Sequence, residues 1–95
     1  MTVLALDRYA VAPDSEKRFR ELIDELLIRM RVAGGILWAD AAKASDDEPS
    51  YVVLSEWRSD ADLEAWETDD PAAVFRDGVD VLLRGEVVRR RFVNA

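Results

Sequence analysis

The 95-residue chain contains no cysteine and no histidine. Without cysteine it can form neither a disulfide nor a thiolate nucleophile nor a cysteine-ligated metal site. Without histidine it lacks the most common general base near neutral pH, the most common metal ligand and the usual proximal ligand of haem. Any catalysis must therefore depend on Asp, Glu, Tyr, Arg, Lys, Ser or Trp side chains, and we expect neither a metal nor another cofactor.

The chain is also poor in long apolar runs and in basic charge. No stretch approaches the roughly 20 apolar residues of a membrane span, and the segment from Met1 to Arg8 lacks the basic start of a signal peptide. The net charge of −7 argues against nucleic acid as a partner, because phosphate binding needs a basic surface. Residues 1–95 are too few for two domains, so we expect one cytoplasmic domain without a membrane contact.

The spacing of apolar residues predicts four strands and two helices. The strands are expected at Val3 to Val11, Ile36 to Ala42, Tyr51 to Trp57 and Glu86 to Val93. The first helix begins at Asp14 or Ser15 and ends at Gly34-Gly35. The second runs from Ser59 to Gly85 and is interrupted at Asp70-Pro71. The order β-α-β-β-α-β is typical of a ferredoxin-like α+β fold, in which the helices cover one face of a four-stranded antiparallel sheet.

Two of these strands carry apolar residues on both faces. The first alternates Val3, Ala5, Tyr9 and Val11 with Leu4, Leu6 and Ala10, and the third alternates Tyr51, Val53 and Trp57 with Val52 and Leu54. In the second strand, Ile36, Trp38 and Asp40 are expected on one side. Because helices cover only one face, the other face would expose an apolar patch that soluble monomers rarely tolerate. We therefore predict a homodimer in which the two sheets pack face to face as an α+β barrel.

Several short motifs occur in the order and spacing of one known family. They are Pro13-Asp14-Ser15-Glu16 with Phe19 and Leu22, Gly34-Gly35, Asp47-Glu48-Pro49-Ser50-Tyr51, Glu56-Trp57-Arg58-Ser59, and then Leu63, Trp66, Phe75 and Leu82-Leu83. Together they cover nearly the whole chain, and they resemble the antibiotic biosynthesis monooxygenase family. One departure is Ala33, where that family usually has a proline. The resemblance implies the dimeric barrel and a pocket in each subunit between the helices and the sheet.

The resemblance also implies candidate pocket residues. Characterised members include cofactor-independent oxygenases of aromatic polyketide intermediates and haem-degrading enzymes, and both have an asparagine and a tryptophan in the pocket. The tryptophan matches Trp66. The asparagine of the oxygenases corresponds to Asp62 and that of the haem-degrading enzymes to Asp7, so acids replace both amides. The haem-degrading enzymes also need a histidine ligand, which is absent here, so we do not expect their reaction or a haem cofactor.

Asp62 and Trp66 lie one helical turn apart and therefore share a face of the second helix. In a functional interpretation, Trp66 stacks on a flat substrate and Asp62 contacts its hydroxyl or its acidic C–H group. In a structural interpretation, Asp62 stabilises the N-terminal end of the helix and Trp66 packs in the core. Both interpretations remain open at this point.

Asp7 interrupts an otherwise apolar strand. If its face is the one that the helices cover, its carboxylate is partly buried and needs a partner. The last strand offers Arg90 on one face and Arg89 and Arg91 on the other, and the pattern leaves open which face turns toward the pocket. We take Arg90 as the candidate; the resulting Asp–Arg pair is either catalytic or a structural ion pair.

Tyr51 and Phe75, with Trp66, are candidate substrate contacts, although a hairpin tyrosine more often serves packing. The full set favours a cofactor-independent monooxygenase that acts on an aromatic, polyketide- or quinol-like molecule. Asp62 or Asp7, made more basic by burial, removes a proton, and the carbanion then reduces O2 directly. The alternatives are a non-oxidative cyclase or isomerase on the same scaffold and a small-molecule-binding protein without turnover.

Overall fold

Four strands form one antiparallel sheet in the order β2-β3-β1-β4. Their bounds are β1 Val3–Ala10, β2 Ile36–Lys43, β3 Ser50–Trp57 and β4 Val88–Val93. The central strands pair with Leu6 opposite Leu54, and β4 joins the other edge of β1 with Arg89 opposite Asp7. The computed structural model describes all residues from Met1 to Ala95, and its architecture is the ferredoxin-like α+β fold predicted from the pattern.

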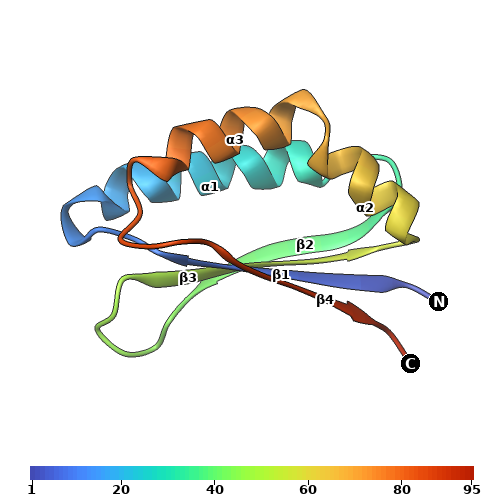
Figure 1. Ribbon diagram of the computed structural model, residues 1–95, viewed down its shortest axis with the longest axis horizontal. Coiled ribbons are helices and arrows are strands. Elements are labelled where there is room, and N and C mark those ends of the chain that lie inside the picture. The colour runs from blue at the N-terminus through green and yellow to red at the C-terminus, as the bar shows by residue number, and fades with distance from the viewer.

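The helices all lie on one side of this sheet (Figure 1). A short 3-10 turn, η1 Pro13–Ser15, leads into α1 Glu16–Met30, and the second helical region is divided into α2 Asp60–Glu67 and α3 Asp70–Asp80. The buried face of α1 is the predicted stripe, formed by Phe19, Ile23, Leu26, Leu27 and Met30. No helix is both long enough and apolar enough to cross a membrane.

Two helices end earlier than their glycines suggest. The helix α1 stops at Met30, and a turn leads to Gly35, whose positive φ of 82° reverses the chain into β2. The helix α3 stops at Asp80 instead of Gly85, because the backbone that follows pairs with the end of β1. The Ala12 N–H donates to Leu82 O, and the Arg84 N–H donates to Ala10 O, both at 2.8 Å. A backbone held in this way cannot continue the helix.

The hydrophobic core lies between the helices and the sheet. Its largest fully buried side chains are Trp57, Phe19, Val11 and Val79. The aromatic rings of Tyr9, Phe19, Tyr51 and Phe75 pack against one another with centroids 5.1–6.5 Å apart. Every residue of β1 that shares the parity of Val3 therefore points into this layer, and Asp7 points there too.

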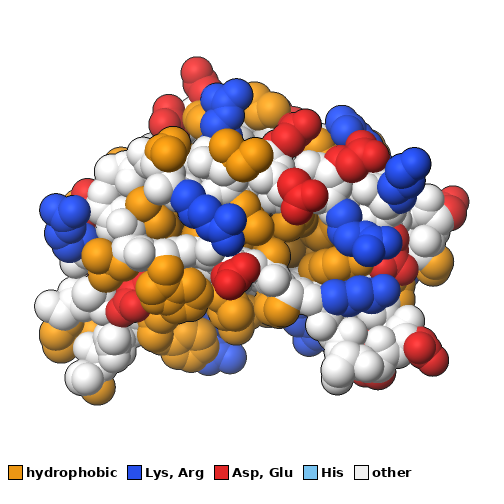
Figure 2. All heavy atoms as spheres, turned by 180° about the vertical axis from the view of Figure 1, so that it is seen from behind, with side chains coloured by type: hydrophobic (Ala, Val, Ile, Leu, Met, Phe, Trp, Pro, Cys, Tyr) orange, Lys and Arg blue, Asp and Glu red, His pale blue; other side chains and the backbone are white.

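The opposite face of the sheet has no covering layer. Leu4, Leu6, Val52 and Leu54 are half-buried there, and Trp38, Val88 and Phe92 are 42%, 49% and 42% exposed. Figure 2 shows hydrophobic side chains gathering at the lower left, on the sheet side of the molecule. A bulge between Ile36 and Trp38 turns Ile36 toward the core and Trp38 outward, so these two residues do not share a face as expected. The prediction that both strand faces are apolar is confirmed.

Candidate functional site

A cavity of about 30 Å³ lies between the covered face of the sheet and the helices α2 and α3. Its walls are mostly apolar and aromatic, with Trp66 on α2 and Phe75 on α3 opposite the strand β1. Acidic and basic groups enter it from four elements: Asp7 on β1, Glu67 on α2, Arg76 on α3 and Arg89 on β4. A space of this size accommodates a water molecule.

Asp7 is the carboxylate that reaches this cavity from the sheet. Burial raises its pKa, the positive charge of Arg89 opposes the rise, and the negative charge of Glu67 adds to it. These charges act through space, and no hydrogen bond or ion pair joins the carboxylate to another residue. Every fully enclosed polar side-chain atom has a hydrogen-bond partner, so the free Asp7 oxygens must be open to the cavity. An unpaired, half-buried carboxylate of raised pKa is suited to accept a proton.

Tyr9 stands two residues further along the same face of β1 and was not predicted as a site residue. The residue is 3% exposed and lines the cavity. Burial is the main cause that raises the pKa of its phenol, and the charge of Asp7 raises it further. The hydroxyl therefore stays protonated and is free to donate a hydrogen bond to an oxygen of a bound molecule. The sequence could have identified Tyr9, because it is two residues from Asp7 in the same strand and its side chain must point to the same face.

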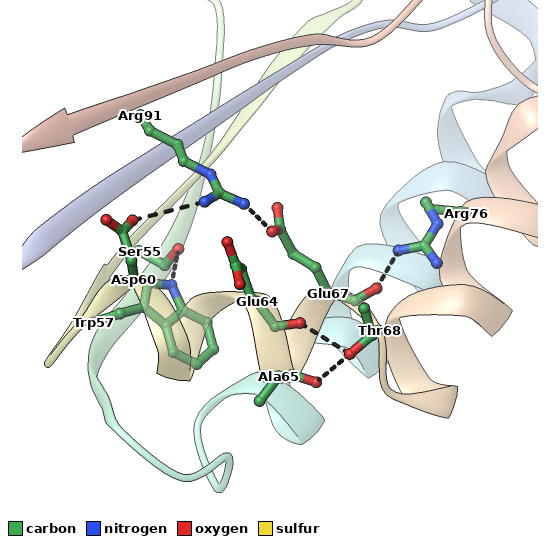
Figure 3. Close-up of polar contacts among 9 residues, drawn as sticks. All are labelled: Ser55, Trp57, Asp60, Glu64, Ala65, Glu67, Thr68, Arg76 and Arg91. Atoms are coloured by element: carbon green, nitrogen blue, oxygen red, sulfur yellow. Dashed lines mark hydrogen bonds and ion pairs between the residues drawn. The ribbon is translucent and has the colours of Figure 1, made fainter.

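Trp66 forms one wall of the cavity and rests on a second indole. Its ring stacks on that of Trp57 with centroids 6.1 Å apart and planes 28° apart. Trp57 in turn donates a hydrogen bond from Nε1 to Ser55 Oγ at 2.8 Å, a contact shown in Figure 3. Because Trp57 is fully buried, Trp66 is held from behind while its other side faces the cavity. The structure thus makes Trp66 both a core residue and a cavity wall.

The arginines of β4 divide between the two faces of the sheet. Arg89 is opposite Asp7 and lines the cavity, and Arg91 is opposite Ala5 on the same face. Arg90, the predicted candidate, is opposite Leu6 on the uncovered face, where its guanidinium lies 5.2 Å from the centroid of the Phe92 ring. Arg90 is therefore not a cavity residue, and Arg89 takes the place expected of it.

Ion pairs close the rim of the cavity on the side of α2. Arg91 reaches across from β4 to Glu67 and, at 3.7 Å, to Asp60 (Figure 3). Arg76 on α3 donates from Nη1 to the main-chain oxygen of Glu67 at 2.8 Å. Glu67 thus ties α2 to both β4 and α3, and its charge is compensated by Arg91.

Asp62 does not enter the cavity. Its main-chain N–H donates to Ser59 Oγ at 3.2 Å, and the same hydroxyl donates back to Asp62 Oδ2 at 3.0 Å. The carboxyl group lies directly against Gly35, where a Cβ atom would overlap it. The structural interpretation of Asp62, as an acid that stabilises the start of α2, is the one that its position supports.

Of the two remaining predicted site residues, Phe75 and Tyr51, only one lies at the cavity. Phe75 lines the cavity with Trp66. Tyr51 instead lies away from it and donates a hydrogen bond to Glu16 Oε2 at 2.6 Å, beside an ion pair of Glu16 with Lys43 at 2.9 Å. Burial is the main cause that raises the pKa of Tyr51. Tyr51 is therefore a packing residue that bridges β3 and α1.

The site thus combines a proton acceptor, a hydrogen-bond donor, a cation and two aromatic walls. These are Asp7, Tyr9, Arg89, Trp66 and Phe75. No group of three or more acidic side chains is placed to hold a metal ion. These groups are suited to accept a proton from a molecule that reaches them and to stabilise the negative charge left on it.

Solved structures share this fold at low sequence identity. Rv0793 from Mycobacterium tuberculosis is 21% identical, with a TM-score of 0.93 over 100% of this chain and 96% of that chain. PA3566 from Pseudomonas aeruginosa is 20% identical, with a TM-score of 0.89 over 99% and 94% of the two chains. A crystal structure of an antibiotic biosynthesis monooxygenase is 15% identical, with a TM-score of 0.91 and 98% coverage of both chains. Among curated proteins none matches the chain.

The sequence itself matches one family model. That model, named ABM for antibiotic biosynthesis monooxygenase, aligns with residues 2–78. The aligned region includes the strand that carries Asp7 and Tyr9 and the helical segments that carry Trp66 and Phe75. Since the match covers most of the chain, this chain belongs to the antibiotic biosynthesis monooxygenase family.

Proposed function

We propose that the protein is a cofactor-independent monooxygenase that oxidises an electron-rich aromatic molecule, of the anthrone or quinol type, with O2. The observation that carries this proposal is Asp7, a carboxylate without a protein partner whose pKa is raised by burial beside Trp66 and Phe75. A base with a raised pKa is better matched to proton removal near neutral pH than an ordinary carboxylate. Membership of the family supports the same class of reaction.

In the proposed reaction, Asp7 takes a proton from the acidic C–H group of the substrate. The resulting carbanion passes one electron to O2, and the substrate radical and superoxide combine to a carbon-bound peroxide. The peroxide is then protonated. The carbon loses its second hydrogen as a proton, the O–O bond breaks, and water leaves, so that a carbonyl group remains. One oxygen atom enters the product and the other leaves as water. Tyr9 and Arg89 stabilise the negative charge that develops on the substrate oxygen.

An aromatic substrate needs more room than the closed cavity provides, because small-molecule sites measure roughly 300–1,000 Å³. A second hollow of about 140 Å³ adjoins the cavity, and Tyr9, Arg76 and Arg89 line both spaces. The two spaces together are still smaller than a typical site, so the Arg76 and Arg89 side chains would have to rotate outward to widen it, which leaves the strand that carries Asp7 in place. We include this opening in the proposal.

The experiment is to follow O2 consumption by the purified protein with dithranol or a related anthrone. We expect oxidation faster than in buffer alone. Asp7→Asn should lower kcat by about 10²–10⁴-fold, the usual contribution of a general base, and Trp66→Phe should raise KM because the substrate loses part of its stacking surface.

Asp62→Asn is the matched control, because it makes the same charge change one helical turn from Trp66 but outside the cavity. Its rate should equal that of the unchanged protein. If the anthrone reacts no faster than in buffer, or if Asp7→Asn and Asp62→Asn behave alike, the proposal is wrong.

A non-oxidative cyclase or isomerase is the second candidate, since Asp7 moves a proton in either reaction without any change in its surroundings. Oxygen uptake separates the two. Product formation from a polyketide-like substrate without O2 consumption would favour the second. Tight binding without any product would favour a small-molecule-binding protein.

We also propose that the protein acts as a homodimer, with the uncovered faces of two sheets packed together. The apolar residues Leu6, Leu54 and Phe92 lie on that face. Its charges are divided, with Arg8 and Arg90 on the β1–β4 half and Asp40 and Glu56 on the β2–β3 half. A two-fold axis along the strands places each basic half over an acidic half, so the surface is complementary to itself.

A further inference from the structure

We propose that Arg76 and Arg89 together bind a carboxylate substituent, so that the substrate is an aromatic acid. This inference rests on the proposed function, because it assigns the substrate class of the same cavity. It starts from the place of the two guanidinium groups. Arg76 comes from α3 and Arg89 from β4, and both line the 30 Å³ cavity and the adjoining hollow of about 140 Å³. They therefore lie where an occupant of both spaces must pass.

Both guanidinium groups have donors to spare. Arg76 uses one nitrogen, Nη1, on the main-chain oxygen of Glu67, and no ion pair holds Arg89. Arg91, the third arginine on this side, is occupied by Glu67 and Asp60. Free guanidinium groups at a cavity mouth are suited to bind carboxylates, because their planar donors match the two carboxylate oxygens.

Three acidic side chains line these spaces, and none of them forms an ion pair with Arg76 or Arg89. The Glu67 carboxylate pairs with Arg91 and forms no ion pair with Arg76 or Arg89. Asp7 lines only the smaller cavity, and Asp80 lines only the adjoining hollow. A substrate carboxylate placed between the two arginines would leave the ring beside Trp66 and within reach of Asp7.

The test compares a carboxylate ligand with its neutral amide, which has nearly the same size and shape. The binding of 1-hydroxy-2-naphthoate and of its neutral amide is measured by calorimetry at pH 7 in low salt. We expect the acid to bind at least about tenfold more tightly, the size of a charge-assisted hydrogen bond. Arg89→Gln and Arg76→Gln should each reduce this preference, and an unchanged circular dichroism spectrum should show that both variants are still folded.

Arg18→Gln is the control, because it removes one positive charge from an exposed position on α1, where Arg18 pairs with Glu21. It should keep the preference for the acid. If the unchanged protein binds acid and amide equally, the arginine assignment is overturned while the aromatic cavity stands. If both ligands bind but the two cavity variants keep the preference, it is also overturned. If neither ligand binds, the proposed function falls as well.

Discussion

Asp7 illustrates how one residue in a strand acquires a chemical property from its neighbours. The same carboxylate on the uncovered face would be solvated, whereas on the covered face it meets Trp66, Phe75 and the phenol of Tyr9. Removal of water disfavours the charged form, and no direct hydrogen bond compensates for that loss. A group of this kind reduces folding stability at neutral pH, and proteins commonly retain such groups because function requires them.

This view predicts a pH-dependent stability change for Asp7→Asn. The pKa of Asp7 is raised in the folded state above the unfolded value of 3.8, so the folded protein binds this proton more tightly. The unfavourable effect is therefore absent at pH values below 3.8 and appears as the pH rises through the raised pKa. Asp7→Asn should raise Tm by a few degrees at pH 7.5 and change it little at pH 4, as measured by thermal unfolding.

Glu16→Gln serves as a control of opposite sign. Hydrogen bonds from Tyr51 and from Lys43 lower the pKa of Glu16, so its contribution favours folding above the unfolded pKa and is lost as the pH falls through the folded one. This variant should therefore be less stable than the unchanged protein at pH 7.5. Equal destabilisation by Asp7→Asn at both pH values would contradict the assignment of Asp7 as an unpaired acid.

At the residue scale, three of the residues predicted from the sequence, Asp7, Trp66 and Phe75, line one cavity in the structure. The sequence did not distinguish Asp62 from Asp7, because an acid near a helix start serves capping and catalysis equally well in a pattern. It also did not select Arg89 over Arg90. Their side chains point to opposite faces, and the difference depends on the pairing of β4 with β1 across more than 80 residues of chain.

The helix α3 shows how local sequence and tertiary contacts combine at the scale of one element. Asp69 caps it by accepting a hydrogen bond from the Asp70 N–H at 2.9 Å, and Pro71 stands in its first turn. Gly78 is in its interior, yet the helix runs through it without a break. A Cβ atom there would meet Leu22 Cδ1 at 3.6 Å, an ordinary van der Waals distance.

We therefore predict that Gly78→Ala stabilises the protein by about 0.5–1 kcal/mol, because alanine restricts the unfolded chain and favours helix. Gly35→Ala should have the opposite effect and cost at least about 1 kcal/mol. Gly35 has a φ of 82° and is covered by the Asp62 carboxyl group. Urea unfolding of the two variants measures both changes. A loss of stability in Gly78→Ala would show that α3 cannot accept the added methyl group.

Element ends depended on contacts that no local pattern contains. The turn after α3 is set by hydrogen bonds to the distant end of β1, and Gly85 takes no part in ending the helix. The bulge between Ile36 and Trp38 similarly follows from pairing with β3, where Trp38 donates to Glu56 Oε1 at 2.7 Å. The sequence predicted the positions of the helices and strands, because hydrophobic periodicity is a local property. It did not predict where the two helices end or where β2 bulges, because contacts with distant segments set these features.

At the scale of the whole molecule, the structure is asymmetric in the way it covers its sheet. The helices enclose one face, whereas Val88 and Phe92 on the other are 49% and 42% exposed. An apolar face of this kind is a typical site of association between subunits. The proposed dimer would bury this face and leave the cavity, which lies on the other side of the sheet, unchanged.

The dimer proposal predicts that Leu54→Glu gives a folded monomer. Leu54 lies near the middle of the uncovered face, opposite Leu6 on β1 and Asp40 on β2. A charge there would be buried without a partner in the dimer but solvated in the monomer. Sedimentation at micromolar concentration should show a dimer for the unchanged protein and a monomer for the variant, with equal helix content by circular dichroism.

Val32→Glu is the matched control, because Val32 is 81% exposed in the turn after α1 and lies away from the uncovered face. It should remain a dimer. A stable monomer of the unchanged protein at micromolar concentration would remove the basis of the proposed assembly.

The sequence by itself determined the order of elements, the ferredoxin-like fold, the two apolar faces of the central strands and the absence of histidine and cysteine chemistry. These properties are local or additive, since each follows from composition or from periodicity within one segment. The tertiary structure alone decided that Asp7, Tyr9 and Arg89 share the cavity while Asp62, Tyr51 and Arg90 do not. Side-chain direction there depends on strand register and on how each helix meets the sheet, which are set by contacts between distant segments.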